Sequence, residues 1–250
     1  MKAVIVTGGT RGIGMAIVDA LVDKILAREP DVDGVRLVVT YRDRTAHAEA
    51  LMDALRAKGV AAETLPMDLA SIGSIESFVR HIRKSYSAVR ALINNAGMTD
   101  DGSFLSLADD AMGRLIESNL SGTIHLTELL LPLLKESNSA AVVFMASAAG
   151  IYGKAGQVPY ATTKGGLIGY TQLLARRVRQ QNICVNAVAP GFIATGMVAG
   201  LAPIMFEPTL NSTSLGAMGA PADVAHVVCS LLKPGYVQAT TIKVDGGFLR

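Results

Sequence analysis

The stretch Ala3-Val-Ile-Val-Thr-Gly-Gly-Thr-Arg-Gly-Ile-Gly14 decides the fold of this 250-residue chain. Its first five residues are mostly β-branched, which predicts a buried strand. Glycine then occupies four of the seven positions from 8 to 14, and a helical pattern of apolar residues continues to about Ala27. A strand, a glycine turn and a helix in this order begin a βαβ unit. The sequence therefore predicts an α/β fold.

The rest of the chain repeats this alternation of short apolar runs and longer helical patterns. The expected strands cover residues 3–7, 36–40, 61–67, 91–94, 140–147, 183–188 and 241–244. The expected helices run to about residue 27 and over about 45–58, 74–86, 107–135 (one long helix or a broken pair), 160–180 and 222–232. Strands joined by helical crossovers pair in parallel and carry helices on both faces. We therefore expect a doubly wound parallel sheet.

Composition favours a single domain with no nucleic-acid partner. No Pro/Ser-rich linker and no block of charge divides the chain, so residues 1–250 are expected to form one domain. The 23 Lys and Arg residues nearly balance the 21 Asp and Glu residues. This balance gives no electrostatic footprint for nucleic acid.

The cysteines and the N-terminus indicate a cytoplasmic protein. Cys184 and Cys229 lie in apolar runs, which is typical of small buried hydrophobes in a reducing compartment. Neither is next to a histidine, so no metal site is expected. The chain begins directly with a strand, and no apolar run reaches the ~18 residues of a membrane span. We expect no membrane partner.

Tyr160 and Lys164 form a candidate acid/base pair. They are four residues apart with no helix breaker between them, so they lie on one helical face. An adjacent ammonium lowers the pKa of a phenol by favouring the phenolate, which suits general acid/base catalysis. Ser147 ends a buried strand thirteen residues earlier and can donate to a substrate oxygen. The alternative is a chance Tyr-x-x-x-Lys spacing, which occurs in many helices.

The glycine turn is a candidate phosphate site. Glycines let the backbone approach a pyrophosphate, whose charge is favoured by the amino end of the following helix. In a doubly wound fold, ligands lie beyond the carboxyl ends of the strands, where this turn is expected. The alternative is a tight turn without a ligand.

Together these motifs resemble the short-chain dehydrogenase/reductase family. The resemblance covers residues 2 to 247 in the family's order and spacing, and it implies a Rossmann-type fold and a nicotinamide cofactor. The sequence around these motifs is most similar to that of 3-oxoacyl-[acyl-carrier-protein] reductases. The motifs are Thr-Gly-x-x-x-Gly-x-Gly at 7–14, Asn94-Asn-Ala-Gly97, Asn119, Ser147, Tyr160-x-x-x-Lys164 and Pro190-Gly191.

The resemblance implies a role for each catalytic residue. Ser147 would hydrogen-bond a substrate carbonyl, and Tyr160 would give it a proton. Lys164 would hold the nicotinamide ribose, and Asn119 would hold a water that leads to this lysine. A simple helix kink is the alternative for Asn119, because asparagine is unfavourable within a helix.

The end of the second strand favours NADP(H) over NAD(H). An NAD enzyme needs a carboxylate there, and this position holds Tyr41, followed by Arg42. Arg11 and Arg42 offer two guanidinium groups to a ribose 2′-phosphate, unless both are solvated loop residues. If the alignment with the family is shifted by two residues, Asp43 instead occupies the position that distinguishes NAD(H) from NADP(H). The cofactor-binding set is Gly8, Arg11, Gly12, Ile13, Gly14, Arg42, Asp68, Asn94, Ala96, Gly97, Tyr160, Lys164, Pro190, Gly191, Ile193 and Thr195.

Two of these assignments have plain structural alternatives. The family acid that Asp68 resembles accepts from the adenine amino group, but an aspartate before a helix is also a common cap. The segment from Asn94 to Gly97 lines the cofactor cleft in the family, but a turn of Asn and Gly has the same composition without a ligand.

The substrate is predicted from a segment at about 192–220, which is the mobile lid in relatives. Its apolar side chains suit the acyl chain of a 3-oxoacyl thioester on acyl carrier protein or CoA, or they pack on the sheet or a second subunit. Arg176, Arg177 and Arg179 could meet an acidic carrier or form a solvated face. Carrier-protein reductases tend to have a basic residue near Pro132, which this chain lacks. The alternatives are an alcohol or sugar dehydrogenase and a non-catalytic dinucleotide sensor.

The helical stretch 122–135 also predicts self-association. It is apolar over more of its circumference than one sheet contact requires. Relatives pair this helix with its symmetry mate, so a homotetramer is expected, with a dimer as the fallback.

Overall fold

A computed structural model gives the structure of the chain and describes residues 1–29, 32–99, 109–195, 210–233 and 235–248. Its seven strands form one sheet in the order β3-β2-β1-β4-β5-β6-β7, and every neighbouring pair is parallel. The predicted doubly wound parallel sheet is confirmed. The strands are β1 (Lys2–Val6), β2 (Val35–Tyr41), β3 (Ala62–Pro66), β4 (Ala88–Asn94), β5 (Ala140–Met145), β6 (Ile183–Pro190) and β7 (Thr241–Val244).

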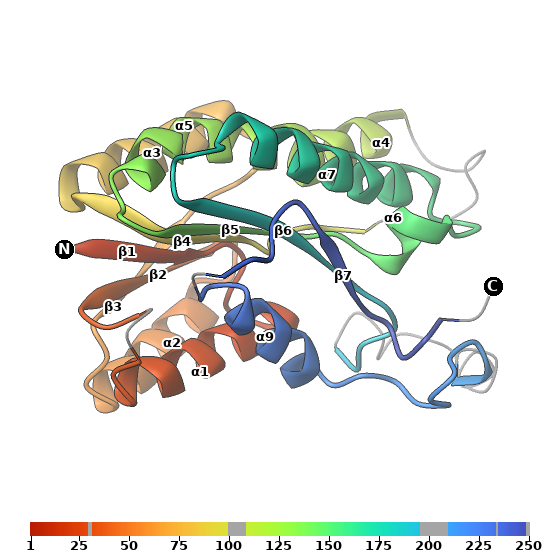
Figure 1. The fold of residues 1–250 in the computed structure, drawn as a ribbon, viewed down its shortest axis with the longest axis horizontal. Helices are drawn as coiled ribbons and strands as arrows, with labels where there is room; N and C mark the ends of the chain where they lie inside the picture. The colour runs from red at the N-terminus through yellow and green to blue at the C-terminus, as the bar shows by residue number, and fades with distance from the viewer. Residues whose placement is uncertain (30–31, 100–108, 196–209, 234, 249–250) are drawn as a thin grey trace.

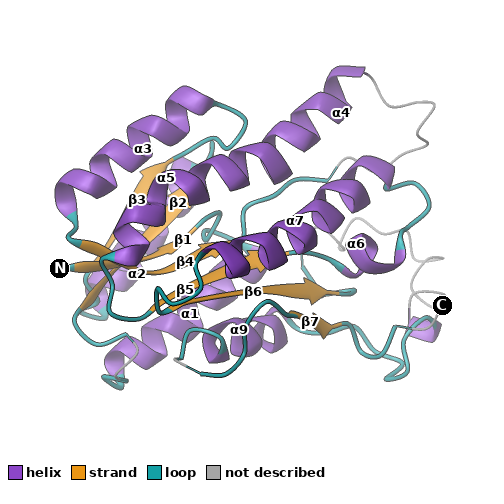
Figure 2. Cartoon of the chain, turned by 45° about the horizontal axis from the view of Figure 1, so that its top comes forward, coloured by secondary structure: helices purple, strands orange, loops and turns teal. Residues whose placement is uncertain are grey.

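Helices cover both faces of the sheet. Figure 1 shows α3, α5 and α7 on one face and α1, α2 and α9 on the other, and Figure 2 shows α4 beside α7 and α6 at the end of the molecule where β6 points. This arrangement follows from right-handed crossovers on a twisted sheet. The helices are α1 (Gly12–Leu26), α2 (Thr45–Ala57), α3 (Ile72–Ser85), α4 (Asp109–Ile116), α5 (Thr123–Lys135), α6 (Ala148–Tyr152), α7 (Val158–Arg177) and α9 (Pro221–Ser230).

Each face of the sheet has its own hydrophobic core. Successive strand side chains point to opposite faces, so Ile5 packs into one core and its neighbours Val4 and Val6 into the other. Strand β5 divides in the same way, with Phe144 in the first core and Val143 in the second. The central strands are therefore apolar throughout rather than alternating, as strands buried on both faces must be.

The segment expected as a long helix or a broken pair is a helix with an irregular middle. α4 passes into a π-helical turn, η2 (Glu117–Gly122), which passes into α5. At Gly122 the helix approaches the loop after β3 so closely that a Cβ would lie 1.9 Å from the carbonyl oxygen of Leu69. Only glycine fits at this contact.

Several boundaries differ from the sequence predictions, and one helix was not predicted. Strand β4 begins at Ala88, three residues before the predicted start. The prediction started late because Arg90 interrupts the apolar run in the sequence. In the structure the side chain of Arg90 is buried and donates to the carbonyl oxygen of Leu232 at 2.8 Å. Strand β5 ends at Met145 rather than Ser147. The short helix α6, which the sequence analysis did not predict, begins immediately after Ser147.

The two cysteines differ in their surroundings. Cys229 lies on α9 and is buried in a hydrophobic core, as expected. Cys184 is partly exposed and is not the buried hydrophobe that was predicted. Neither cysteine forms a disulfide bond. Of the helices that the structure describes, none combines the length and the apolar character needed to span a bilayer.

Candidate active site

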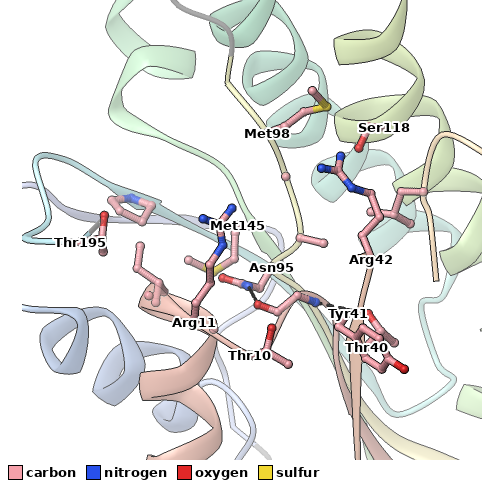
Figure 3. A pocket seen from close by; sticks show the side chains of 18 of the residues that line it. Thr10, Arg11, Thr40, Tyr41, Arg42, Asn95, Met98, Ser118, Met145 and Thr195 are labelled. Carbon is pink, nitrogen blue, oxygen red and sulfur yellow. Dashed lines mark hydrogen bonds between the residues drawn. The ribbon is translucent and has the colours of Figure 1, made fainter. Parts of the chain in front are cut away.

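A cavity of about 460 Å³ opens at the carboxyl ends of the central strands (Figure 3). It lies where the strand order reverses between β1 and β4, the place where doubly wound folds bind ligands. Its lining includes nearly all the residues that the sequence analysis selected. These are Gly8, Arg11, Gly12, Ile13, Gly14, Arg42, Asp68, Ala96, Gly97, Ser147, Tyr160, Lys164, Pro190, Gly191, Ile193 and Thr195.

The glycine turn is shaped for close backbone approach. Gly8 and Gly12 have φ of 63° and 55°, a region that favours glycine. A Cβ at Gly14 would lie 2.2 Å from the carbonyl oxygen of Gly8. The side chain of Arg11, the N-cap residue of α1, makes no capping hydrogen bond in the described structure. The first amide groups of α1 therefore face the cavity without a side-chain cap, which fits an anionic group.

Asn95 holds this turn in place, and the sequence analysis did not select it. Its Nδ2 donates to the carbonyl oxygens of Thr7 at 2.9 Å and Gly8 at 3.1 Å. The hydroxyl of Thr7 accepts in turn from the backbone N–H of Ala96 at 2.9 Å. These bonds tie the end of β1 to the end of β4. The available signal was its position next to Asn94 in the same motif.

Asn94 itself does not line the cavity. Its side chain is 2% exposed, and its Nδ2 donates to the hydroxyl of Thr127 on α5 at 3.1 Å. Asn94 therefore connects β4 to α5 beneath the site, and its expected contact with the cofactor stays a prediction.

Tyr160 and Lys164 lie one turn apart near the start of α7, as the spacing predicts. The Lys164 ammonium is 5.6 Å from the centre of the Tyr160 ring and donates to the carbonyl oxygen of Met145 at 2.7 Å. Lys164 is 4% exposed, and burial lowers the pKa of its ammonium from the usual 10.5 to about 8. A buried ammonium beside a phenol is a group that can change charge near neutral pH.

Ser147 links the end of β5 to the cavity. Its hydroxyl oxygen accepts from the backbone N–H of Ala149 at 3.2 Å, which caps α6. A hydroxyl that accepts one bond still has its own proton to donate. Ser147 can therefore cap the helix and donate to a ligand at the same time.

Asn119 lies in the π-helical turn and does not reach the cavity lining. Its Oδ1 accepts from the backbone N–H of Met98 at 2.8 Å, and its Nδ2 donates to the Met98 carbonyl oxygen at 2.7 Å. Nδ2 also lies 3.4 Å from the hydroxyl of Thr163 on α7. Asn119 thus connects the loop after β4 to the helix that carries Tyr160. The helix is irregular here, as the alternative reading of Asn119 expects. The role of Asn119 in catalysis stays a prediction.

Charged side chains surround the cavity at the end of β2. Figure 3 shows the guanidinium groups of Arg11 and Arg42 both pointing to the side where Met98 lies. Asp43 pairs with Arg42 at 3.1 Å, and this hydrogen bond keeps the pKa of Asp43 below its usual value. Arg44, which the sequence analysis did not select, also lines the cavity. Three arginines and one aspartate therefore share this end.

Asp68 lies in the loop after β3 and also lines the cavity. Its carboxylate accepts from the backbone N–H of Ala70 at 2.9 Å. The N-cap of α3 is instead Ser71, which accepts from Ser74. The helix-capping alternative for Asp68 is therefore wrong, and the carboxylate remains at the cavity.

The proposed lid is described only at its two ends, and Met197, Leu201, Met205 and Phe206 lie outside the described residues. At the far end of α7, Arg177 forms a two-pronged ion pair with Glu128 of α5, with N–O distances of 2.6 and 3.0 Å. The same hydrogen bonds lower the pKa of Glu128. Arg177 is thus used within the chain, which leaves Arg176 and Arg179 of the three arginines. Within the described residues, no three His, Cys, Asp or Glu side chains are grouped to bind a metal.

A doubly wound parallel sheet with a glycine turn at its switch point defines a dinucleotide-binding class of protein. Sequence comparison gives the family. The family described as short chain dehydrogenase matches residues 2–203, and the chain belongs to it. It is therefore an enzyme of this oxidoreductase family.

Three relatives are similar over almost their whole length, and each is a 3-oxoacyl-[acyl-carrier-protein] reductase FabG. The protein from Staphylococcus aureus (strain Mu50) is 31% identical over 248 residues, which is 98% of this chain and 97% of that protein. The protein from Staphylococcus epidermidis is 31% identical, with 98% of each chain covered. The protein from Salmonella typhimurium is 33% identical over 98% of this chain and 96% of its own length.

Proposed function

We propose that this enzyme reduces the ketone of a 3-oxoacyl thioester to a hydroxyl group with NADPH. The observation that carries the proposal is that Ser147, Tyr160 and Lys164 line the same cavity as the glycine turn. The identity of 31–33% to 3-oxoacyl-[acyl-carrier-protein] reductases supports a thioester as the substrate. A single domain and a cytoplasmic location remain predictions.

The residues around the cavity fit a dinucleotide. The open turn at Gly8 and Gly14 and the uncapped amino end of α1 would hold the pyrophosphate. Arg11 and Arg42 would contact a ribose 2′-phosphate, and Asp68 would accept from the adenine amino group. The loop from Pro190 to Thr195 would pack against the nicotinamide. When it is bound, the nicotinamide supplies the hydride.

The protein's own contribution is to bind the ketone and supply a proton. The Ser147 hydroxyl donates to the ketone oxygen and fixes its position. The Tyr160 phenol gives its proton to this oxygen, which gains negative charge during reduction. Lys164 places a positive charge beside the phenolate that forms, so these contacts are stronger in the transition state than in the ground state.

Asn119 acts through its neighbours rather than on the substrate. Its side-chain amide is bonded to Met98 and Thr163. If Asn119 holds a water that leads to Lys164, as in relatives, we infer that its backbone carbonyl does so.

A substrate panel tests the proposed function. Initial rates with NADPH and with NADH would be compared for acetoacetyl-CoA, an acetoacetyl thioester of acyl carrier protein, quinones and simple ketones. We expect the thioesters to have the highest kcat/KM and NADPH to be the better cofactor. Faster oxidation of alcohols or sugars with NADP⁺ would indicate the dehydrogenase alternative, and binding of cofactor without turnover would indicate a sensor.

A further inference from the structure

Three aromatic rings gather beside the active site at the carboxyl ends of β6 and β7. The ring of Tyr152 stacks on that of Phe248, with centroids 5.5 Å apart and an angle of 23° between the planes. The ring of Phe192 tilts against Phe248 at 6.0 Å. All three residues are partly exposed. The rings therefore form an apolar wall that solvent can reach.

Two exposed lysines flank this wall. The Lys154 ammonium lies 5.1 Å from the centre of the Phe192 ring. The Lys243 ammonium lies 5.6 Å from the centre of the Tyr152 ring and donates to the Tyr152 hydroxyl at 2.9 Å. Cation–π contacts of this kind hold an ammonium against a ring face while its charge remains accessible. We call Tyr152, Lys154, Phe192, Lys243 and Phe248 the aromatic–lysine cluster.

The charge of the cluster favours an anion. Among the described residues, the carboxylate of Asp245 faces it from the segment after β7. This carboxylate is buried and accepts from the backbone N–H of Gly247 at 3.1 Å and from the Tyr152 hydroxyl at 3.4 Å. Two ammonium groups and one carboxylate give the described part of the cluster a net positive charge. Lys243 bonds to Tyr152, which bonds to Asp245, whereas Lys154 lies against Phe192. A ligand with an anionic end and an apolar body matches this surface.

The cluster is continuous with the active site. Gly191 lines the cavity and directly precedes Phe192. A Cβ at Gly191 would lie 2.7 Å from the Cα of Asp245, so the two segments are in close contact. On the other side, the helix α6 that carries Tyr152 starts right after Ser147. The cluster thus lies on the substrate side of the site, toward β7, whereas Arg11 and Arg42 lie toward β2.

The arginines at the end of α7 are too distant for the same task. Arg176 is sixteen residues after Tyr160 in the same helix, which places it about 24 Å away along the axis at 1.5 Å per residue. Figure 1 shows that α7 runs from the end of the molecule near α6 toward the side of the N-terminus. Lys154, by contrast, is only six residues before Tyr160 in the sequence.

We propose that the aromatic–lysine cluster binds the phosphate end of the pantetheine arm of the thioester substrate. Lys154 contacts the phosphate, and the rings of Phe192 and Phe248 pack against the apolar part of the arm. This inference rests on the proposed reduction of thioesters and assigns a place to the part of the substrate farthest from the ketone. CoA and acyl carrier protein both present this chemistry, since each carries a phosphorylated pantetheine.

Steady-state kinetics with a matched pair of thioesters test the site. The substrates are acetoacetyl-4′-phosphopantetheine and acetoacetyl-pantetheine, which differ only in the phosphate. We expect Lys154→Ala to raise the KM of the phosphorylated thioester about tenfold, the effect of one lost charge-assisted contact. The KM of the unphosphorylated thioester and both kcat values should not change. Arg176→Ala is the control and should change neither KM. Equal effects on both thioesters, or no effect on either, would overturn the site.

Direct binding separates this inference from the proposed function. Calorimetry would compare the binding of 4′-phosphopantetheine and of pantetheine to the wild type and to Lys154→Ala. If the wild type binds 4′-phosphopantetheine more tightly than pantetheine and Lys154→Ala loses this difference, the site is supported even if the enzyme reduces no thioester. If the wild type binds the two compounds equally well, the site is contradicted. In kinetics, a Lys154→Ala defect confined to acetoacetyl-CoA assigns the CoA arm, and one confined to the carrier thioester assigns the carrier arm. Either result supports the site.

Discussion

The ammonium of Lys164 donates a hydrogen bond to the backbone carbonyl oxygen of Met145 at 2.7 Å. This bond joins α7 to the last residue of β5, two residues before Ser147. Because Tyr160 lies one helical turn before Lys164, the same bond sets the position of the phenol relative to the end of the strand. The acid/base pair is therefore anchored to the sheet rather than held by the helix alone.

The buried ammonium predicts a specific dependence of stability on pH. Its pKa is about 8 in the folded chain and 10.5 in an ordinary exposed lysine. Between these values the unfolded chain binds more protons, so the folded state gains stability as the pH rises through this window. Relative to Lys164→Met, the wild type should gain about 2 kcal/mol of unfolding free energy between pH 7 and pH 9.5.

Urea unfolding of both proteins at several pH values measures this difference. Any effect of the substitution that is the same at every pH, such as the loss of the bond to Met145, cancels in this change with pH. If the unfolding free energy of the wild type, measured relative to that of the variant, does not rise between pH 7 and pH 9.5, the pKa of Lys164 is not lowered in the folded protein.

Replacement of the phenol hydroxyl tests the proton donor. Tyr160→Phe should lower kcat by ~10² or more, the usual contribution of a general acid. The binding of NADPH, followed by fluorescence, should persist because the ring remains beside Lys164. Tyr236→Phe is a matched control, since Tyr236 is fully exposed. If Tyr160→Phe keeps its turnover, the proton comes from another group.

Much of the fold was predictable because its strands are separated by glycines and helical patterns. The exceptions depend on contacts between distant residues. Strand β4 extends back through Arg90 because the carbonyl oxygen of Leu232, 142 residues away, accepts its buried guanidinium. No local pattern marks Arg90 as a strand residue. The five-residue helix α6 is too short to give a periodic signal.

The candidate site divides in the same way. The sequence identified three residues that line the same cavity in the structure, namely Ser147, Tyr160 and Lys164. Asn95 was missed because its role is to bond backbone atoms 87 and 88 residues away. The pairing of Arg177 with Glu128 was also hidden, since 49 residues separate the two. The type of a residue indicates which chemistry its side chain can perform. Which residue it contacts can be known only from the fold.

Glycine substitutions test the close approach in the phosphate turn. In Gly14→Ala, the new Cβ would lie 2.2 Å from the Gly8 carbonyl oxygen, so the turn must open. We expect cofactor binding to be lost and stability to fall by roughly 1–3 kcal/mol. Gly73→Ala in α3 is the control, because nothing lies within 4 Å of its new Cβ. This variant should gain up to about 1 kcal/mol. Normal cofactor affinity in Gly14→Ala would argue against the pyrophosphate site.

Two arginine variants test the preference for NADPH. Arg11→Ala and Arg42→Ala each remove a proposed partner of the 2′-phosphate, so the Kd for NADPH should rise about tenfold or more. The Kd for NADH should change little. Fluorescence titration with both cofactors measures this. Arg42 forms an ion pair with Asp43, so both residues lie where the cofactor ribose is expected. If the wild type prefers NADH, Asp43 rather than Arg42 determines the choice of cofactor.

The outer face of α5 and α7 predicts the assembly. The leucines at 126, 130, 131 and 134 in α5 are buried within the chain, so α5 alone leaves less apolar surface than its sequence indicates. Leu173 of α7 is nevertheless 55% exposed and lies one turn before Arg177, which pairs with Glu128 of α5. We expect these helices to pack against a second copy around a two-fold axis, in a homotetramer.

Light scattering of the wild type and of two leucine variants tests this assembly. Leu173→Glu places a charge in the proposed contact and should convert the tetramer into dimers, because an unpaired charge is costly at a buried interface. Leu26→Glu alters a leucine of similar exposure, 52%, at the end of α1. It should leave the tetramer intact. A wild type that is monomeric at micromolar concentration would contradict the prediction, and a tetramer that survives Leu173→Glu would move the contact to another face.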